Sequence, residues 1–339
     1  MSNSYNSFKL QAENLDNLLK TNPTIVLVSH TNPDGDALGS TLALYQVLKN
    51  LGHNVTAIVP NGYPSFLEWI PYINDVVIAE SKQKLTEKVI KDAEIIICLD
   101  FNAFHRVERL ENYLTKSKAV KVLIDHHLEP ASYFDISISD VSASSTSELV
   151  YNLIEDFGYE AHIDQGVAEC LYVGIMTDTG SFSYSCNHER TYIITSRLIA
   201  KGVDPQRVHN LVYDTFSENR LRLLGHLLRN KMVVVPKFKT AYISLSLADQ
   251  KKYNYQIGDS EGIVNYALSI EGIRLAAFFT EKKDKVRISF RSKGDFSVNE
   301  LARAYFDGGG HKNAAGGNSY TTLIKTKRYF ESLLPLLAL

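Results

Sequence analysis

The sequence predicts an α/β protein, in which a doubly wound, mainly parallel sheet is followed by a smaller α/β domain. Over the first 200 residues, short apolar runs typical of buried strands alternate with segments of helical periodicity. Three of these runs end on aspartate or histidine, as strands do when their carboxyl ends carry a ligand site. Beyond about residue 230 the pattern changes to shorter strands.

The first strand is predicted at residues 24–28 (TIVLV), and the apolar spacing of residues 37–50 predicts the helix that follows it. A helix containing Arg106 and Arg109 is expected after the central strand. The other strands of the first domain are predicted at 54–59, 76–79, 94–99 and 120–124, and the other helices at about 10–19, 81–91, 145–159 and 163–177.

Helices are predicted from 189 to 229, interrupted by the Gly-Val-Asp-Pro stretch at 202–205. We therefore expect a first domain at 1–201, a helical linker at 202–230 and a second domain at 231–339, with the active-site cleft between the domains. The second domain is predicted to contain strands at 232–235, 240–246, 273–280 and 286–291, helices near 261–270, 297–306 and 322–337, and a glycine-rich loop at 308–317.

Composition indicates an ordinary globular protein, with 45% hydrophobic and 22% charged residues among 339. The N-terminus lacks the basic start and apolar stretch of a signal peptide, and no apolar run has transmembrane length. Three dispersed cysteines indicate reduced thiols, so we expect a cytoplasmic protein.

Charge is unevenly distributed along the chain. Residues 1–230 carry 19 basic and 28 acidic side chains, a net charge of −9, whereas residues 231–339 carry 17 and 10, a net charge of +7. The acidic part suits cations and the basic part suits an anionic substrate, although solvated surface charge alone is an alternative explanation.

Side chains able to bind metals follow several predicted elements. They are His30, Asp34 and Asp36 after the first strand, Asp100 after the central strand, Asp125, His126 and His127 after the next, and Asp178 after an apolar helix. Taken singly, each has a simpler explanation, such as a helix N-cap, a packed histidine or a turn. Together they share one sheet edge and one ligand chemistry. Imidazole and carboxylate without cysteine favour two divalent cations, most of all Mn²⁺, with Mg²⁺, Co²⁺ or Zn²⁺ as substitutes.

These motifs resemble those of a known family. The stretch HTNPDGD at 30–36, a strand ending in Asp100, the triplet at 125–127 and Asp178 together resemble the four motifs of the DHH phosphoesterase family. The stretch GGGHKNAAGG at 308–317 resembles the signature of the DHH-associated domain of nano-RNA-degrading and exopolyphosphatase-like members. The resemblance covers about residues 15–320.

The resemblance implies two cation sites and the roles of the residues around them. It assigns one cation to His30, Asp34, Asp100 and Asp178, and the other to Asp36, Asp100, His126 and Asp178. It implies that His127 contacts the substrate or the leaving group, that Asp36 takes part in catalysis, and that Asp125 orients a histidine.

Substrate contacts are expected mainly in the second domain. The resemblance assigns nucleotide binding to Arg291, Ser292, Gly308, Gly309, Gly310 and His311. Glycine-rich loops bring backbone N–H groups close to an anion, although a flexible turn is an alternative. Arg106 is a further phosphate candidate, or else an ordinary surface charge. Asp307 stands where the family usually has another glycine, so its side chain is expected to face away from the loop or to cap it.

The resemblance implies a two-metal phosphoesterase. Its expected substrates are short oligoribonucleotides, cleaved to mononucleotides, and 3′-phosphoadenosine 5′-phosphate (PAP), dephosphorylated to AMP. Long duplex nucleic acid and membranes are not expected partners. Alternatives are an exopolyphosphatase- or pyrophosphatase-like enzyme, a linear dinucleotide phosphodiesterase, and a nucleotide-binding protein without catalysis. The last alternative is disfavoured because all six ligand positions of the family motifs carry a histidine or an aspartate in this sequence.

The oligomeric state is left open by the sequence. The apolar segment 333–339 is suited to pack either on its own domain or on a second subunit, so a homodimer is one of two alternatives.

Overall fold

The structure is a computed structural model that describes residues 2–337, with side chains from residue 9 onward. The chain forms two compact units that divide between Thr215 and Phe216, and each unit contains a six-stranded sheet. The predicted α/β fold class is confirmed. The predicted linker region holds the helices α8 (Pro205–Tyr213) and α9 (Glu218–Asn230), with Asp204 capping α8.

The sheet of the first unit is parallel throughout, in the order β3-β2-β1-β4-β5-β6. Its strands are β1 (Ile25–Val28), β2 (Val55–Val59), β3 (Val77–Ile78), β4 (Ile95–Leu99), β5 (Val120–Asp125) and β6 (Ile136–Ser139). The chain runs outward from β1 to β3 and then returns to β4, on the other side of β1. The strand order therefore reverses between β1 and β4, which is where open α/β sheets form a ligand crevice.

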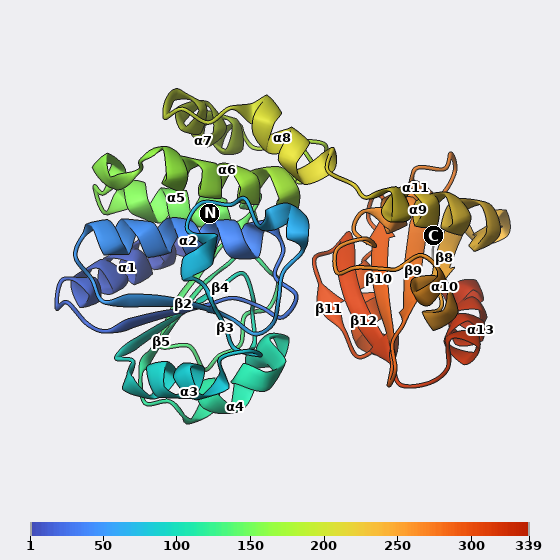
Figure 1. The fold of residues 1–339 in the computed structure, drawn as a ribbon, viewed down its shortest axis with the longest axis horizontal. Helices are drawn as coiled ribbons and strands as arrows, with labels where there is room; N and C mark the ends of the chain where they lie inside the picture. Colours follow the sequence, from blue (N-terminus) through green and yellow to red (C-terminus); the bar gives the residue numbers. More distant parts are fainter. Residues whose placement is uncertain (1, 338–339) are drawn as a thin grey trace. The chain divides into compact units, whose positions relative to one another are not determined.

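Helices cover both faces of this sheet (Figure 1). One face carries α1 (Ser2–Leu19), α2 (Gly35–Asn50), α5 (Thr146–Asp156) and α6 (Gln165–Asp178), and the other carries α3 (Gln83–Asp92) and α4 (Glu111–Lys116). α7 (Glu189–Ala200) packs on α6. α2 is almost fully buried and lies close to α6, since a Cβ added at Gly39 would come within 2.4 Å of the Cys170 carbonyl oxygen.

The second unit contains a mixed sheet in the order β11-β12-β10-β9-β8-β7, in which only the β8–β9 pair is parallel. Its strands are β7 (Met232–Val235), β8 (Thr240–Leu245), β9 (Leu275–Glu281), β10 (Val286–Ser292), β11 (Gly309–Gly310) and β12 (Ala314–Ser319). Its remaining helices are α10 (Leu247–Lys252), α11 (Ile263–Leu268), α12 (Val298–Tyr305) and α13 (Leu323–Leu333). α9 and α11 contribute to one core of the unit, and α12 and α13 to the other.

Short 3₁₀ segments connect many of these elements. They lie at Ser65–Leu67, Ile73–Asp75, Phe104–Leu110, Glu160–His162, Pro236–Phe238 and Leu334–Leu336. The helix predicted around Arg106 and Arg109 is one of these 3₁₀ segments, and it is broken at Glu108, whose φ is +41°. The predicted helix is thus present as a 3₁₀ segment that contains both arginines, and the α-helical geometry begins only with α4 at Glu111.

The glycine-rich stretch was wrongly predicted to be only a loop, because β11 and β12 pair within it. Its glycines permit very close backbone packing. A Cβ added at Gly308 would lie 2.0 Å from the Gly316 carbonyl oxygen, and Gly310 has a φ of +147°. The packing of the sheet therefore requires these glycines, independently of any role in ligand binding.

The apolar C-terminal segment packs, in its described part, on its own unit. Leu333 and Leu334 are buried in that core, whereas Leu336 is exposed. Residues 338–339 of the predicted segment lie outside the described residues. Within residues 2–337, no helix combines the length and the apolar composition that crossing a bilayer requires.

Candidate metal centre

Asp34 stands at the start of α2 and has two partners. Its Oδ1 accepts hydrogen bonds of 3.1 Å from the backbone N–H groups of Asp36 and Ala37, so it is the N-cap of the helix. Its Oδ2 lies 3.8 Å from Nε2 of His30, which follows β1. The N-cap interpretation and the ligand interpretation of Asp34 are therefore compatible, because each uses a different oxygen.

Asp36 is fully buried in the first turn of α2, and both of its oxygens face the N-terminus of α5. The backbone N–H of Thr146 donates to Oδ2 at 2.6 Å, and that of Ser147 donates to Oδ1 at 2.9 Å. These are two of the amides that every helix leaves unpaired in its first turn, and they favour a negative charge.

Asp100 follows β4 directly and lies between two groups of side chains. Its Oδ2 is 3.3 Å from Nε2 of His30, and its Oδ1 is 3.6 Å from Nε2 of His126. The hydroxyl of Thr146 donates to the same Oδ1 at 3.1 Å. The backbone of Asp100 is left-handed, with a φ of +65°, a strained conformation that is frequent at functional sites.

The two candidate histidine ligands each present Nε2 to carboxylates. Nδ1 of His30 lies 3.0 Å from the Thr31 carbonyl, and Nδ1 of His126 lies 3.3 Å from the Ala143 carbonyl. Because a carbonyl can only accept, Nδ1 carries the proton in both rings, which leaves the Nε2 lone pair for a cation. Nε2 of His126 is 3.1 Å from Oδ2 of Asp178, at the end of α6.

His127 is oriented by the first residue of its own triplet. Its Nδ1 lies 2.7 Å from Oδ1 of Asp125, and both side chains are buried. Burial, the guanidinium of Arg106 and the ring of His126 hold the pKa of His127 well below its ordinary value. The same interaction indicates that the charge of Arg106 is close to this side of the centre.

The electrostatics of the cluster call for a cation. Burial raises the pKa of Asp36 to about 7, and the nearby Asp178 carboxylate adds to the effect. Burial, followed by the Asp36 carboxylate, raises the pKa of Asp100 well above its ordinary value. Burial alone would lower the pKa of His126, but the carboxylates of Asp178, Asp100 and Asp36 outweigh it and raise that pKa. Buried carboxylates so close together repel one another, and divalent cations would relieve this.

The geometry of the donor atoms fits such cations. His30, Asp34 and Asp100 form one group, and Asp36, His126 and Asp178 form another; within each, the ligand atoms lie within 4.8 Å of one another. Cations bound at about 2.0–2.2 Å would have neighbouring ligand atoms about 3 Å apart, close to the shorter of these separations. The donors are nitrogen and oxygen without sulfur, so the structure brings all six predicted ligands into a centre that is able to hold divalent cations.

The N-terminus of α5 was missed as part of this centre by the sequence analysis. Ser145 caps the helix by accepting from the Glu148 N–H at 3.1 Å. The helix itself was predicted to start at residue 145, where the Ser-x-x-Glu spacing at 145–148 is a recognisable start signal. Nothing in that signal reveals that Thr146 and Ser147 reach residues more than 40 and 100 positions away.

The predicted substrate residues of the second unit lie on or beside β10 and β11. Arg291 donates to the Phe290 carbonyl at 3.0 Å. The Ser292 hydroxyl donates to the Phe296 carbonyl at 2.7 Å, and the N–H of Gly310 donates to Asn299 Oδ1 at 2.9 Å. These two polar groups already have partners inside the unit, which gives them a part in shaping the glycine segment.

The side chain of Asp307, next to the glycine segment, is held by a hydrogen bond. Its backbone is left-handed, with a φ of +43°, and its Oδ2 accepts a hydrogen bond of 2.9 Å from the Tyr320 hydroxyl. A left-handed backbone explains why glycine is usual at this place, and aspartate is among the residues that tolerate it. The expectation that the added carboxylate is engaged away from the loop agrees with this contact.

Comparison with known proteins gives the family. Residues 24–175 match the family model described as the DHH family, N-terminal domain, and residues 237–332 match the DHHA1 domain. The bifunctional oligoribonuclease and PAP phosphatase NrnA of Bacillus subtilis is 31% identical over 302 residues, which cover 88% of this chain and 90% of that protein. The chain belongs to the DHH family. It is therefore a phosphoesterase of that family, and the predicted resemblance is confirmed.

Two further relatives of this DHH-family chain agree with the assignment. The probable bifunctional oligoribonuclease and PAP phosphatase NrnA of Streptococcus mutans is 31% identical, and the alignment covers 94% of this chain and 96% of that protein. The crystal structure of an exopolyphosphatase-related protein from Bacteroides fragilis has 42% identity and a TM-score of 0.90, over 96% of each chain. The fold of both units is thus that of a solved relative.

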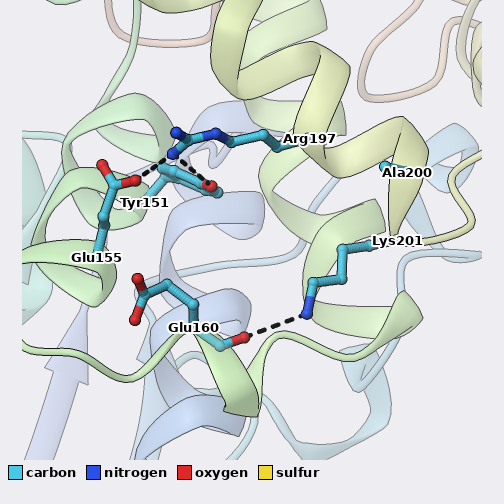
Figure 2. Close-up of a pocket in the computed structure, with 6 residues that line it drawn as sticks. All are labelled: Tyr151, Glu155, Glu160, Arg197, Ala200 and Lys201. Carbon is cyan, nitrogen blue, oxygen red and sulfur yellow. Dashed lines mark hydrogen bonds and ion pairs between the residues drawn. The ribbon is translucent and has the colours of Figure 1, made fainter.

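A pocket in the first unit lies away from the metal centre. Figure 2 shows its lining residues, Tyr151, Glu155, Glu160, Arg197, Ala200 and Lys201. Arg197 pairs with Glu155, and Lys201 donates to the Glu160 carbonyl. Glu155 is near the C-terminal end of α5, nine residues from Thr146 and so about 13 Å along the helix. Glu155 is already paired with Arg197, and among the described residues no group of three metal-binding side chains includes a residue of this pocket.

Proposed function

We propose that this DHH-family phosphoesterase hydrolyses short oligoribonucleotides to mononucleotides and converts PAP to AMP. The observation that carries the proposal is the convergence of two histidines and four aspartates from four separate segments of the first unit. The activities named for the two bacterial relatives, aligned over nearly their whole length, supply the substrate class. Substrates of this kind occur inside cells, which supports a cytoplasmic location.

The centre is proposed to hold two divalent cations, most of all Mn²⁺, with Mg²⁺ or Co²⁺ as substitutes. The mixture of imidazole and carboxylate donors supports this choice. One cation is assigned to His30, Asp34, Asp100 and Asp178, and the other to Asp36, Asp100, His126 and Asp178. When bound, such a pair would lower the pKa of a water molecule and neutralise charge on a phosphoryl group.

The remaining residues of the first unit are proposed to act on the phosphate. Asp125 fixes the plane of the His127 ring, so that the ring meets the scissile phosphate or the leaving oxygen in one orientation. Arg106 is held through its backbone carbonyl, which accepts from the Thr31 N–H at 2.9 Å. Its guanidinium is then available as a fork of donors to phosphate oxygens.

Nucleotide recognition is proposed for the second unit. Its positive net charge, +7 over residues 231–339, favours an anionic ligand. Arg291 and His311 are partly exposed and offer polar side chains. Ser292 and the glycines at 308–310 are proposed to shape the surface that these side chains use, in addition to any contact of their own.

A substrate panel with Mn²⁺ tests the proposal. We expect fast release of mononucleotides from di- to pentaribonucleotides, conversion of PAP to AMP, and slow turnover of long RNA and of single-stranded DNA. Excess chelator and the Asp178→Ala variant should abolish all of these activities. Full activity in either case would refute the two-cation site, and inactivity on both oligoribonucleotides and PAP would refute the substrate class.

Hydrolysis of polyphosphate is a second candidate. It is favoured by the relative from Bacteroides fragilis, which is named as exopolyphosphatase-related and is 42% identical to this chain. Adding polyphosphate and pyrophosphate to the same panel separates the two candidates, because only a nucleotide-specific enzyme would prefer diadenylate and PAP to both.

A further inference from the structure

Thr146, the first residue of α5, contacts two of the candidate cation ligands at once. Its backbone N–H donates to Oδ2 of Asp36 at 2.6 Å, and its hydroxyl donates to Oδ1 of Asp100 at 3.1 Å. Asp36 belongs to α2, whereas Asp100 follows β4. One residue of a third element therefore links carboxylates from two others.

The contact is built into the interior of the unit. Thr146 and Asp36 are fully buried and Asp100 is 3% exposed. Water has little access to replace the hydroxyl if it is removed, so Asp100 Oδ1 would lose that donor without compensation. The neighbouring Ser147 N–H donates to the other oxygen of Asp36, so both oxygens of that carboxylate accept hydrogen bonds from the first turn of α5.

The Thr146 hydroxyl also determines which oxygen of Asp100 faces which group of ligands. With Oδ1 held by Thr146, this oxygen lies 3.6 Å from Nε2 of His126, and Oδ2 lies 3.3 Å from Nε2 of His30. Rotation of the Asp100 carboxyl would break the bond to Thr146. The hydrogen bond thereby keeps the carboxyl in the orientation in which Oδ1 faces the group of His126 and Oδ2 faces the group of His30.

We propose that Thr146 is a positioning residue of the metal centre, whose hydroxyl presets the Asp100 carboxylate to bridge the two cations. The inference rests on the proposed cation sites and adds to them a residue that itself binds no cation. Groups that orient metal ligands through hydrogen bonds typically change metal affinity by about 10- to 100-fold when they are removed. An effect of that size is therefore expected for the hydroxyl alone.

The test compares Thr146→Val, which keeps the shape and removes the hydroxyl, with Thr146→Ser, which keeps the hydroxyl. Mn²⁺ binding to the metal-free full-length protein is measured by titration calorimetry. We expect Thr146→Val to weaken Mn²⁺ binding about 10- to 100-fold and Thr146→Ser to stay within about threefold of the wild type. At saturating Mn²⁺, the Val variant should regain most of its kcat, with KM nearly unchanged.

A matched control is Thr41→Val in α2. Thr41 is also fully buried in the first unit, and within the described residues its hydroxyl makes no hydrogen bond. The same substitution there should leave Mn²⁺ affinity unchanged. Thermal unfolding of the metal-free variants separates folding from positioning, because a merely structural role would lower the midpoint and leave the affinity of the folded protein unchanged.

The outcomes are distinguishable. Wild-type Mn²⁺ affinity in Thr146→Val would overturn the inference, and so would equal losses in the Val and Ser variants. If Thr146→Val does not fold, Thr146→Ala against Thr146→Ser gives the same comparison with a smaller side chain. Absence of Mn²⁺ binding to the wild-type protein would instead refute the proposed cation sites.

Discussion

Nδ1 of His127 lies 2.7 Å from Oδ1 of Asp125, two residues earlier and at the end of β5. The strand fixes the backbone of Asp125, and the carboxylate fixes the histidine ring. The first residue of the triplet thus orients the last one, while the middle residue, His126, faces the other candidate cation ligands.

We expect Asp125→Asn to lower kcat by about 10- to 100-fold with little change in Mn²⁺ affinity. An amide would form a weaker hydrogen bond to Nδ1 of His127 than a carboxylate does, and it would not fix which ring nitrogen of His127 carries the proton. Steady-state kinetics and calorimetric Mn²⁺ titration check this. An unchanged kcat would show that the contact has no part in turnover. Asp135→Asn, an aspartate on the far side of the next loop that accepts from the Lys121 N–H, is the control and should leave kcat unaltered.

Substitution of Arg106 by alanine is expected to raise KM for PAP and diadenylate about tenfold, since the proposed charge-assisted contact with phosphate would be lost. Arg109, three residues further, is half exposed and pairs with Glu80. Arg109→Ala is therefore the control and should leave KM within about twofold, as exposed ion pairs contribute little. Equal effects of the two substitutions on KM would contradict a specific role of Arg106.

Two glycine-to-alanine substitutions in the second unit should have opposite signs. Gly308→Ala places a Cβ 2.0 Å from the Gly316 carbonyl oxygen, so β11 must separate from β12, and we expect a loss of about 2 kcal/mol or more. Gly225 lies inside α9 with no atom within 4 Å of an added Cβ, so Gly225→Ala should stabilise by about 0.5–1 kcal/mol. Urea unfolding of both variants measures the two effects, and a destabilising Gly225→Ala would show that the helix differs from the one described.

Asp249 gives the second unit a pH-dependent contribution to stability. Burial alone would raise its pKa, but hydrogen bonds from the Ser246 hydroxyl, Lys231 and His226 outweigh this and lower the pKa to about 2. A carboxyl whose pKa is lower in the folded state stabilises the protein above its unfolded pKa of about 4, and that contribution is lost as the pH falls towards 2.

We therefore expect Asp249→Asn to lower the free energy of unfolding by about 1 kcal/mol at pH 7, with the difference from the wild type shrinking between pH 4 and pH 2. Thermal unfolding at several pH values measures this. Asp295→Asn, which affects an exposed pair with Lys312, should change stability little at any pH. A pH-independent difference for Asp249→Asn would contradict the assigned cause.

Much of the first unit could be predicted from its sequence because parallel strands are buried on both faces. Such strands appear in the sequence as continuous apolar runs, for example residues 25–28 and 95–99, and they can be recognised without knowing which strands pair with them. The six ligand candidates could be found because each follows such a run or an apolar helix. β6 (Ile136–Ser139) was not predicted, since four alternating residues give too little signal.

Other features depend on contacts that no local pattern encodes. β11 and β12 consist largely of glycine and alanine, so their pairing leaves no alternation of side chains to detect. The bond from the Thr146 N–H to Asp36 joins residues 110 positions apart. It becomes visible only when the packing of α5 against α2 is known.

The left-handed backbone of Asp100 restricts what evolution or engineering can place there. Among residues with an oxygen donor, aspartate and asparagine accept a φ of +65° most readily, whereas glutamate carries both a longer reach and a conformational penalty. Exchange of this carboxylate for its nearest chemical homologue would thus disturb the main chain as well as the ligand. As a proposed cation ligand with this backbone, Asp100 is therefore expected to accept almost no conservative replacement without loss of activity.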